Sequence, residues 1–312
     1  MEDVINNLYD AYYADNYDDK FIHNEAYKTS PEFEIKVLDK LLSKNSKWLD
    51  VACGTGYFLS KFPNHHRAGL DLSNSMLAKT KHNNPNINEL RLGNFKDIYP
   101  QWNNCWDITS SMWGAYCYVE NMNEFNQFVQ NISSWTKPGG LCFLPLIDFN
   151  LLLYRSGKVE HYDSNVGIFG GPFYIDGVTW SYLDSEHNKM HKHLLSPHED
   201  YIKKEFQKYF EEVITIYYPP FAYPNPGQRT AFLAINKKGE NSSIPSFTRA
   251  KIDEIISWSN TNKENVITRE QYMKIMGEDT PTIKTEKLRG LKLLWHKTPE
   301  PIRKIGRRIL GI

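Results

Sequence analysis

The sequence predicts an α/β protein with a Rossmann-like, mostly parallel seven-stranded sheet that carries helices on both faces. Short apolar runs of strand length alternate with amphipathic helical patterns, which is the order expected of such a sheet. The first apolar run ends in a glycine-rich turn, and an acidic residue lies at the end of the second run. Together these features indicate a doubly wound domain with a ligand at the carboxyl ends of its strands.

The glycine-rich turn follows the apolar run 48–52, which reads as a strand buried on both faces. Ala52, Gly54 and Gly56 form an A-x-G-x-G pattern with almost no side chain, so a ligand can lie directly against the backbone. The pattern lacks the third glycine of a pyrophosphate fingerprint and the G-K-[S/T] of a P-loop. A nucleoside without phosphates is therefore the ligand that the turn favours.

Two aspartates accompany this turn. Asp50 lies on the first strand, and Asp71 follows about 20 residues later at the end of the second strand, the spacing of a ribose-binding acid. An ionised carboxylate only accepts hydrogen bonds and can take both ribose hydroxyls. We expect Asp71 to bind the ribose.

The remaining elements complete the alternation. A helix capped by Ser30, a helix capped by Ser73, and a helix with a capping box at Asn121 and Glu124 are predicted between strands. The turn 137–140 is expected to lead into the fifth strand, and Ser196 with Pro197 to start a further helix. The other predicted strands cover 67–70, 88–92, 107–111, 141–146, and the closing antiparallel pair 212–218 and 230–236.

Five motifs in order resemble those of class I S-adenosylmethionine-dependent methyltransferases. They are LDVACGTG, GLDLSNSML, GNF, WDITSSMW and KPGG, and the resemblance covers residues 9–238. The wording of the first two motifs is most similar to the branch that methylates small molecules, including sugars and amino acids. One glycine turn alone would be weak evidence, whereas five motifs at the expected spacing are specific.

The resemblance implies S-adenosyl-L-methionine as cofactor and a small metabolite as methyl acceptor, methylated at oxygen or nitrogen, with sugars and glycosylated natural products first among the candidates. Asn94 stands where many relatives carry Asp, and its carbonyl oxygen can still accept from the adenine amine. Met76 either covers a face of the nucleobase or belongs to the ordinary core. The implied cofactor-binding residues are Tyr13, Asp50, Ala52, Gly54, Gly56, Asp71, Leu72, Met76, Asn94, Phe95, Ser111 and Met112.

The amino-terminal segment 1–23 reads as an amphipathic helix rich in tyrosine. Its LYDAYY stretch resembles a V-Y-D-x-x-Y segment that folds over the active site in this branch, with Tyr13 as the last tyrosine. Tyr13 is therefore a candidate catalytic residue. The candidates for a catalytic base are Asp148, at the end of the fifth strand, and His161 or Tyr162 in the insertion, none of which has a motif behind it.

An insertion at 147–196 is expected to build the wall of the substrate site, with a hairpin of strands 178–183 and 190–194. His187, His191 and His193 invite a metal interpretation, but neither a cysteine nor a clear carboxylate completes a ligand set. We therefore predict no metal site and interpret these histidines as exposed residues of the hairpin.

Lysine plus arginine and aspartate plus glutamate each number 37 in the 312 residues, so the balanced charge gives no reason to expect a nucleic-acid substrate. The sequence shows neither a long apolar run nor a signal-peptide pattern, which favours a cytoplasmic protein. The four cysteines form no C-x-x-C pair and read as buried thiols.

Residues 239–312 are expected to form a basic helical extension beyond the methyltransferase domain, 1–238. From Lys284 onward the sequence contains nine lysines and arginines and two glutamates, a net charge of +7. This tail either packs on the acidic remainder of the chain or on a second subunit of a homodimer, or it contacts an anionic membrane surface. An alternative to the enzyme is a non-catalytic, nucleoside-binding subunit that acts through this tail.

Overall fold

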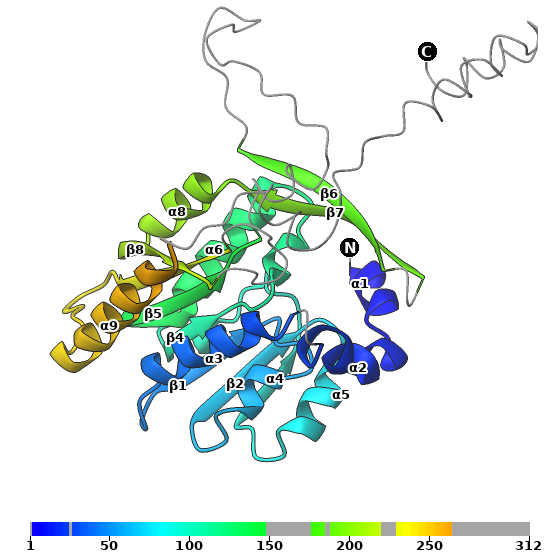
Figure 1. Ribbon diagram of the computed structural model, residues 1–312, viewed down its shortest axis with the longest axis horizontal. Coiled ribbons are helices and arrows are strands. Elements are labelled where there is room, and N and C mark those ends of the chain that lie inside the picture. Colours follow the sequence, from blue (N-terminus) through cyan, green and yellow to red (C-terminus); the bar gives the residue numbers. More distant parts are fainter. Residues whose placement is uncertain (1, 25–26, 148–175, 185–187, 220–228, 264–312) are drawn as a thin grey trace, which may run out of the picture. The chain divides into compact units, whose positions relative to one another are not determined.

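The computed structural model describes residues 2–24, 27–147, 176–184, 188–219 and 229–263 (Figure 1). These residues lie in the first of two compact units, Met1–Val266, while the second comprises Ile267–Ile312. The candidates Asp148, His161 and Tyr162 lie outside the described residues, as do His187 and the basic tail.

A seven-stranded sheet with the order β3-β2-β1-β4-β5-β9-β8 forms the centre of the unit. The first five strands pair in parallel, and β9 is antiparallel to both of its neighbours. This confirms the predicted fold class. The strands are β1 Lys47–Val51, β2 His66–Asp71, β3 Glu89–Leu92, β4 Trp106–Ser110, β5 Thr136–Pro145, β8 Phe210–Tyr217 and β9 Thr230–Lys237.

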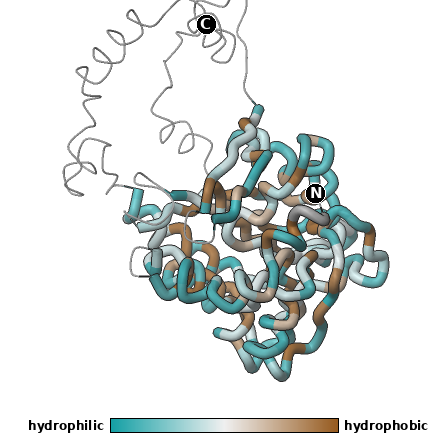
Figure 2. The backbone as a smooth tube through the Cα atoms, turned by 90° about the vertical axis from the view of Figure 1, so that its right-hand side faces the viewer, coloured by the Kyte–Doolittle hydropathy of each residue, from teal (hydrophilic) through white to brown (hydrophobic). Residues whose placement is uncertain are grey.

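Helices cover both faces of this sheet (Figure 1). One core includes side chains of α6 (Met122–Trp135) and α8 (Glu199–Gln207), and the other includes those of α3 (Thr29–Leu41), α4 (Tyr57–Ser60) and α9 (Ser246–Lys263). Trp48 of β1 belongs to the second core and Leu49 to the first, because successive strand residues point to opposite faces. Brown apolar stretches alternate with teal polar ones along the backbone in Figure 2.

Helix α9 packs against the sheet, although in the sequence it comes after the methyltransferase motifs. Ile252 and Ile255 are fully buried, and the Trp258 ring stacks on Phe33 with 5.0 Å between centroids. The Asn262 side chain donates to the carbonyl of Tyr217 in β8 at 2.9 Å. The compact unit therefore extends through α9. Among the helices of the described part, none is long and apolar enough to cross a membrane.

The amino-terminal segment consists of α1 (Glu2–Leu8), α2 (Ala11–Tyr17) and the π-helix η1 (Asp18–Ile22). Beside it lies the predicted hairpin, formed by β6 (Gly177–Asp184) and β7 (Lys189–Pro197). Lys189 Nζ donates to the Leu8 carbonyl and to Asp10 Oδ2, both at 2.6 Å. Lys20 of η1 forms a second ion pair, with Asp184 at the end of β6. Two ion pairs therefore join the hairpin to the amino-terminal segment.

Three local predictions were wrong about where an element begins. Helix α3 starts at Thr29 with Lys28 at its N-cap, and Ser30 is buried within its first turn. Ser196 lies in β7, which ends at Pro197, and its hydroxyl accepts from the Trp180 indole, so His198 caps α8 instead. The K-P-G-G stretch lies inside β5, where a register shift beside β4 accommodates it.

Candidate functional site

A cavity of about 980 Å³, including its open mouth, lies at the carboxyl ends of β1, β2 and β4. This is the edge where ligands bind in open α/β sheets. The amino-terminal segment covers the cavity through Ile5, Tyr9, Tyr17 and Ile22. Of the predicted cofactor residues, those lining the cavity are Ala52, Gly54, Asp71, Leu72, Met76, Asn94, Phe95 and Met112.

The two glycines of the turn have different structural roles. Gly54 lines the cavity with φ of +57°, and a Cβ built there meets nothing within 4 Å. Gly56 does not line the cavity, and a Cβ there would lie 2.5 Å from Thr80 Cγ2 of α5 (Asn74–Asn83). Gly54 therefore leaves room for a ligand, whereas Gly56 permits close packing of the turn against α5.

Asp71 is fixed at the cavity by the backbone. Its Oδ2 accepts from the Gly54 amide at 2.8 Å and its Oδ1 from the Ser73 amide at 2.9 Å. Burial raises the pKa of Asp71, while these backbone N–H groups act against the rise. A carboxylate offers about four acceptor positions, so Asp71 retains capacity for a ligand hydroxyl.

Asp50 lies behind the turn and is only 1% exposed. Its Oδ1 accepts from the Ser110 hydroxyl at 2.7 Å, and Ser110 in turn accepts from the Trp48 indole at 2.9 Å. Asp50 Oδ2 has no hydrogen-bond partner among the described residues. Burial raises the pKa of Asp50 to about 8. Asp50 therefore links β1 to β4 and does not line the cavity.

The wall expected to face a nucleobase contains Met76, Asn94 and Phe95. Met76 lines the cavity and also packs with Tyr13 and Ala14 in a small core, so both interpretations of this residue stay open. The Asn94 carbonyl oxygen, Oδ1, accepts from the Lys96 amide at 3.0 Å. The Phe95 ring meets Phe128 edge-on at 5.2 Å, which supports it from behind.

The end of β4 contributes Met112 and Trp113, both from the W-D-I-T-S-S-M-W motif expected at this end of the sheet. Trp113 has φ of +56°, a left-handed conformation that is rare for a bulky residue and often found at functional sites. Behind it lies a buried ion pair, with 3.2 Å between Arg229 Nη2 and Glu34 Oε1. Ser111 is buried and does not line the cavity.

Hydrogen bonds hold the amino-terminal segment over the cavity. Ser73 Oγ donates to the Tyr9 carbonyl at 2.7 Å, and Thr55 Oγ1 donates to Asp18 Oδ1 at 2.6 Å. Tyr9 and Tyr17 line the cavity, whereas Tyr13 is 1% exposed and lies among Tyr9, Tyr17 and Phe21. The catalytic and cofactor-binding role of Tyr13 stays a prediction.

His191 was expected to be exposed, and the structure shows that it is completely buried. Lys192 and His193 together oppose Ser181 in the hairpin, which is a β-bulge that separates His191 from the exposed His193. The adjacent Leu194 and Leu195 are both buried, a break in strand alternation that could have signalled this bulge. No cluster of three metal-ligating side chains occurs among the described residues.

Comparison with known proteins matches residues 49–144 to the family model of the methyltransferase domain. Residues 49–144 are therefore similar to a methyltransferase domain. This agrees with the sequence motifs, and the matched segment runs from β1 into β5. The amino-terminal segment and the β6–β7 hairpin lie outside it. A search of curated proteins finds no match.

Solved structures show the same methyltransferase fold. The DhpI-SAH complex is 15% identical, with a TM-score of 0.50 over 76% of this chain and 98% of that one. An S-adenosylmethionine-dependent methyltransferase from Clostridium acetobutylicum is 17% identical, with a TM-score of 0.47 over 68% and 92%. CalS10, an amino pentose methyltransferase from Micromonospora echinaspora, is 17% identical, with a TM-score of 0.45 over 69% and 92%.

Proposed function

We propose that this chain binds S-adenosylmethionine in the cavity and transfers its methyl group to an oxygen or nitrogen of a small metabolite. The observation that carries the proposal is Asp71, which two backbone amides hold at the cavity beside the open face of Gly54. Asp71 lies within residues 49–144, the segment that matches the methyltransferase domain.

The residues around the cavity suit such a cofactor. Asp71 can accept from ribose hydroxyls, and the missing side chain of Gly54 lets the cofactor approach the backbone. Met76 and Phe95 offer apolar contacts for a nucleobase, and Asn94 is a neutral polar partner beside them. The methionine part would lie toward Met112 and Trp113 at the end of β4.

When bound, the cofactor supplies a methyl group that its positive sulfur already activates. The protein then has to hold the acceptor in line with this group, and such positioning can contribute about 7 kcal/mol or more. The amino-terminal segment covers part of the cavity through Ile5, Tyr9, Tyr17 and Ile22. A small acceptor suits a site covered in this way, and we keep sugars and glycosylated natural products as the first candidates.

Calorimetric titration with S-adenosylmethionine tests the cofactor site. We expect Asp71→Ala to lower the affinity at least tenfold, because charge-assisted hydrogen bonds contribute roughly 1.5–3 kcal/mol. The exposed Asp39→Ala on α3 is a matched control and should bind like the parent. The melting temperature of each variant shows whether it has folded. Unchanged binding by folded Asp71→Ala would contradict the proposed site.

A methyl-transfer screen over a metabolite library, read by formation of S-adenosylhomocysteine, tests the enzyme itself. Turnover with a small sugar or glycoside would support the substrate class. Tight cofactor binding without turnover on any acceptor would favour the alternative, a nucleoside-binding subunit that is not catalytic.

A further inference from the structure

Three polar side chains form a continuous hydrogen-bonded chain at one side of the cavity. Tyr9 and Tyr118 both line the cavity, and their hydroxyl oxygens lie 2.7 Å apart. The Tyr118 oxygen also lies 2.7 Å from Nδ1 of His191. The chain thus runs from the amino-terminal segment, across the residue after η3 (Ala115–Cys117), to strand β7 of the hairpin.

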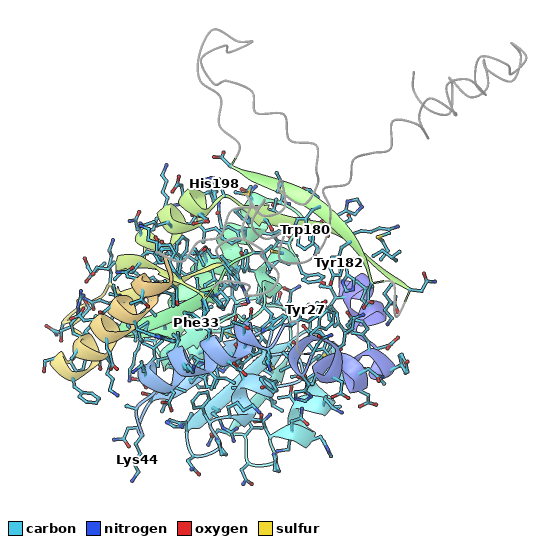
Figure 3. All side chains as sticks on the ribbon, in the orientation of Figure 1. Tyr27, Phe33, Lys44, Trp180, Tyr182 and His198 are labelled. Atoms are coloured by element: carbon cyan, nitrogen blue, oxygen red, sulfur yellow. The ribbon has the colours of Figure 1, made fainter. Side chains whose placement is uncertain are left out.

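His191 at the end of this chain is enclosed. The ring has no exposed surface and stacks on Tyr182 with 4.3 Å between centroids and 5° between planes. Tyr182 and Trp180 extend from β6, where Figure 3 labels both. Nε2 of His191 has no hydrogen-bond partner among the described residues. A buried polar atom without a partner costs about 1–3 kcal/mol, so a structural role alone explains His191 poorly.

The surroundings keep this ring neutral. Burial is the main cause that lowers the pKa of His191 to about 4; Lys189 and Lys20 act in the same direction and Asp184 in the opposite one. A neutral imidazole has one nitrogen that donates and one that accepts. If Nε2 carries the hydrogen, Nδ1 accepts from Tyr118, and the tyrosine oxygens can accept from a group in the cavity.

Methyl transfer requires a destination for one proton. The acceptor atom shares a lone pair with the methyl carbon, the carbon–sulfur bond breaks, and its electron pair stays on sulfur. The O–H or N–H group of the acceptor becomes strongly acidic as the new bond forms, so even a weak base can take its proton.

We propose that His191 receives, through Tyr118, the proton that the methyl acceptor loses. This inference rests on the proposed methyltransferase function. The acceptor hydrogen moves to the Tyr118 oxygen while the Tyr118 hydroxyl hydrogen moves to Nδ1, which leaves a neutral methylated product, an intact Tyr118 hydroxyl and an imidazolium. After the product leaves, the proton returns through Tyr118 to the cavity and from there to solvent. His191 acts through Tyr118 and is thus a positioning residue.

Nitrogen NMR of the full chain, labelled with ¹⁵N-histidine and saturated with S-adenosylhomocysteine, tests this without knowledge of the acceptor. We expect a His191 ring that is neutral at pH 7, with the hydrogen on Nε2 and a bare Nδ1. A hydrogen on Nδ1, or a ring already charged, would overturn the proposal. His193→Asn identifies the signal of the neighbouring exposed histidine and should leave that of His191 unchanged.

Kinetics with an acceptor found in the library screen provide a second measurement. We expect His191→Gln to lower kcat about 100-fold and to change its pH dependence, with affinity for S-adenosylhomocysteine within twofold of the parent. Tyr118→Phe interrupts the same chain and replaces this variant should it not fold. A lower melting temperature with the parental kcat and pH profile would show a merely structural chain. If the parent protein itself does not bind S-adenosylhomocysteine, the methyltransferase function is refuted instead.

Discussion

Asp50→Asn should change how the stability of the protein depends on pH. The amide carbonyl introduced by this substitution can still accept from Ser110, so the link between β1 and β4 is kept and only the ionisation is removed. In the folded chain, burial holds the Asp50 pKa at about 8 instead of the ordinary 3.8. Between these values the folded protein keeps a proton that the unfolded chain releases. The wild-type protein therefore loses stability as the pH rises through this window.

One pKa unit corresponds to about 1.36 kcal/mol, so the shift from 3.8 to about 8 amounts to roughly 6 kcal/mol over the whole window. We expect the two proteins to differ least near pH 4. The free energy of unfolding of Asp50→Asn, relative to the wild type, should then rise by an amount of that order up to pH 8.

Urea denaturation of both proteins without cofactor, at intervals from pH 4 to pH 8, measures this difference. Other groups that titrate in the window, such as His191, contribute equally to both proteins and cancel. Asp39→Asn, an exposed carboxyl on α3, is the control and should follow the wild type throughout. A difference between Asp50→Asn and wild type that stays constant with pH would show that Asp50 is ionised in the folded protein, and it would refute the reasoning.

Three further outcomes can be measured. Arg229→Met should lower the free energy of unfolding by about 3–5 kcal/mol, because it leaves Glu34 buried without its ion pair. Adding Glu34→Gln should recover part of the loss, and equal unfolding free energies for the single and double variants would contradict the pairing. Lys189→Met should speed amide hydrogen exchange in α1 and α2, and unchanged exchange would show that the ion pair does not hold this segment. If the tail contacts membranes, the full chain should sediment with anionic liposomes at low salt and not at high salt. A chain ending before Thr282 should stay in solution, and equal sedimentation of both chains would contradict the membrane hypothesis.

The sequence was sufficient where a short motif determines the geometry. The spacing from the glycine turn identified Asp71, and the structure places it at the cavity. The predicted caps at Ser73 and Asn121 accept from the amides of Met76 and Glu124, as the local pattern requires. The two caps depend on residues within one helical turn of each other, and Asp71 on the spacing between two neighbouring strands, which this type of sheet keeps nearly constant.

The polar chain beside the cavity could not be predicted in this way. Tyr9 and Tyr118 are 109 positions apart, and only the packing of the amino-terminal segment against η3 brings them together. His191 became buried through a bulge, and a one-residue change of register reverses the face of every following side chain. Residue types alone do not specify such a register.

The position of β9 between β5 and β8 has a consequence for how the chain is made. Strand β8 pairs only with β9 in the sheet, and β9 is the later of the two in the sequence. During synthesis β8 is therefore made before its pairing strand, and it cannot enter the sheet until residues 230–237 have formed β9. Its apolar residues Val213 and Ile216 are exposed during that interval, which is a period of increased risk of aggregation. A released chain truncated between these two strands should therefore depend on chaperones more than one truncated after Lys237.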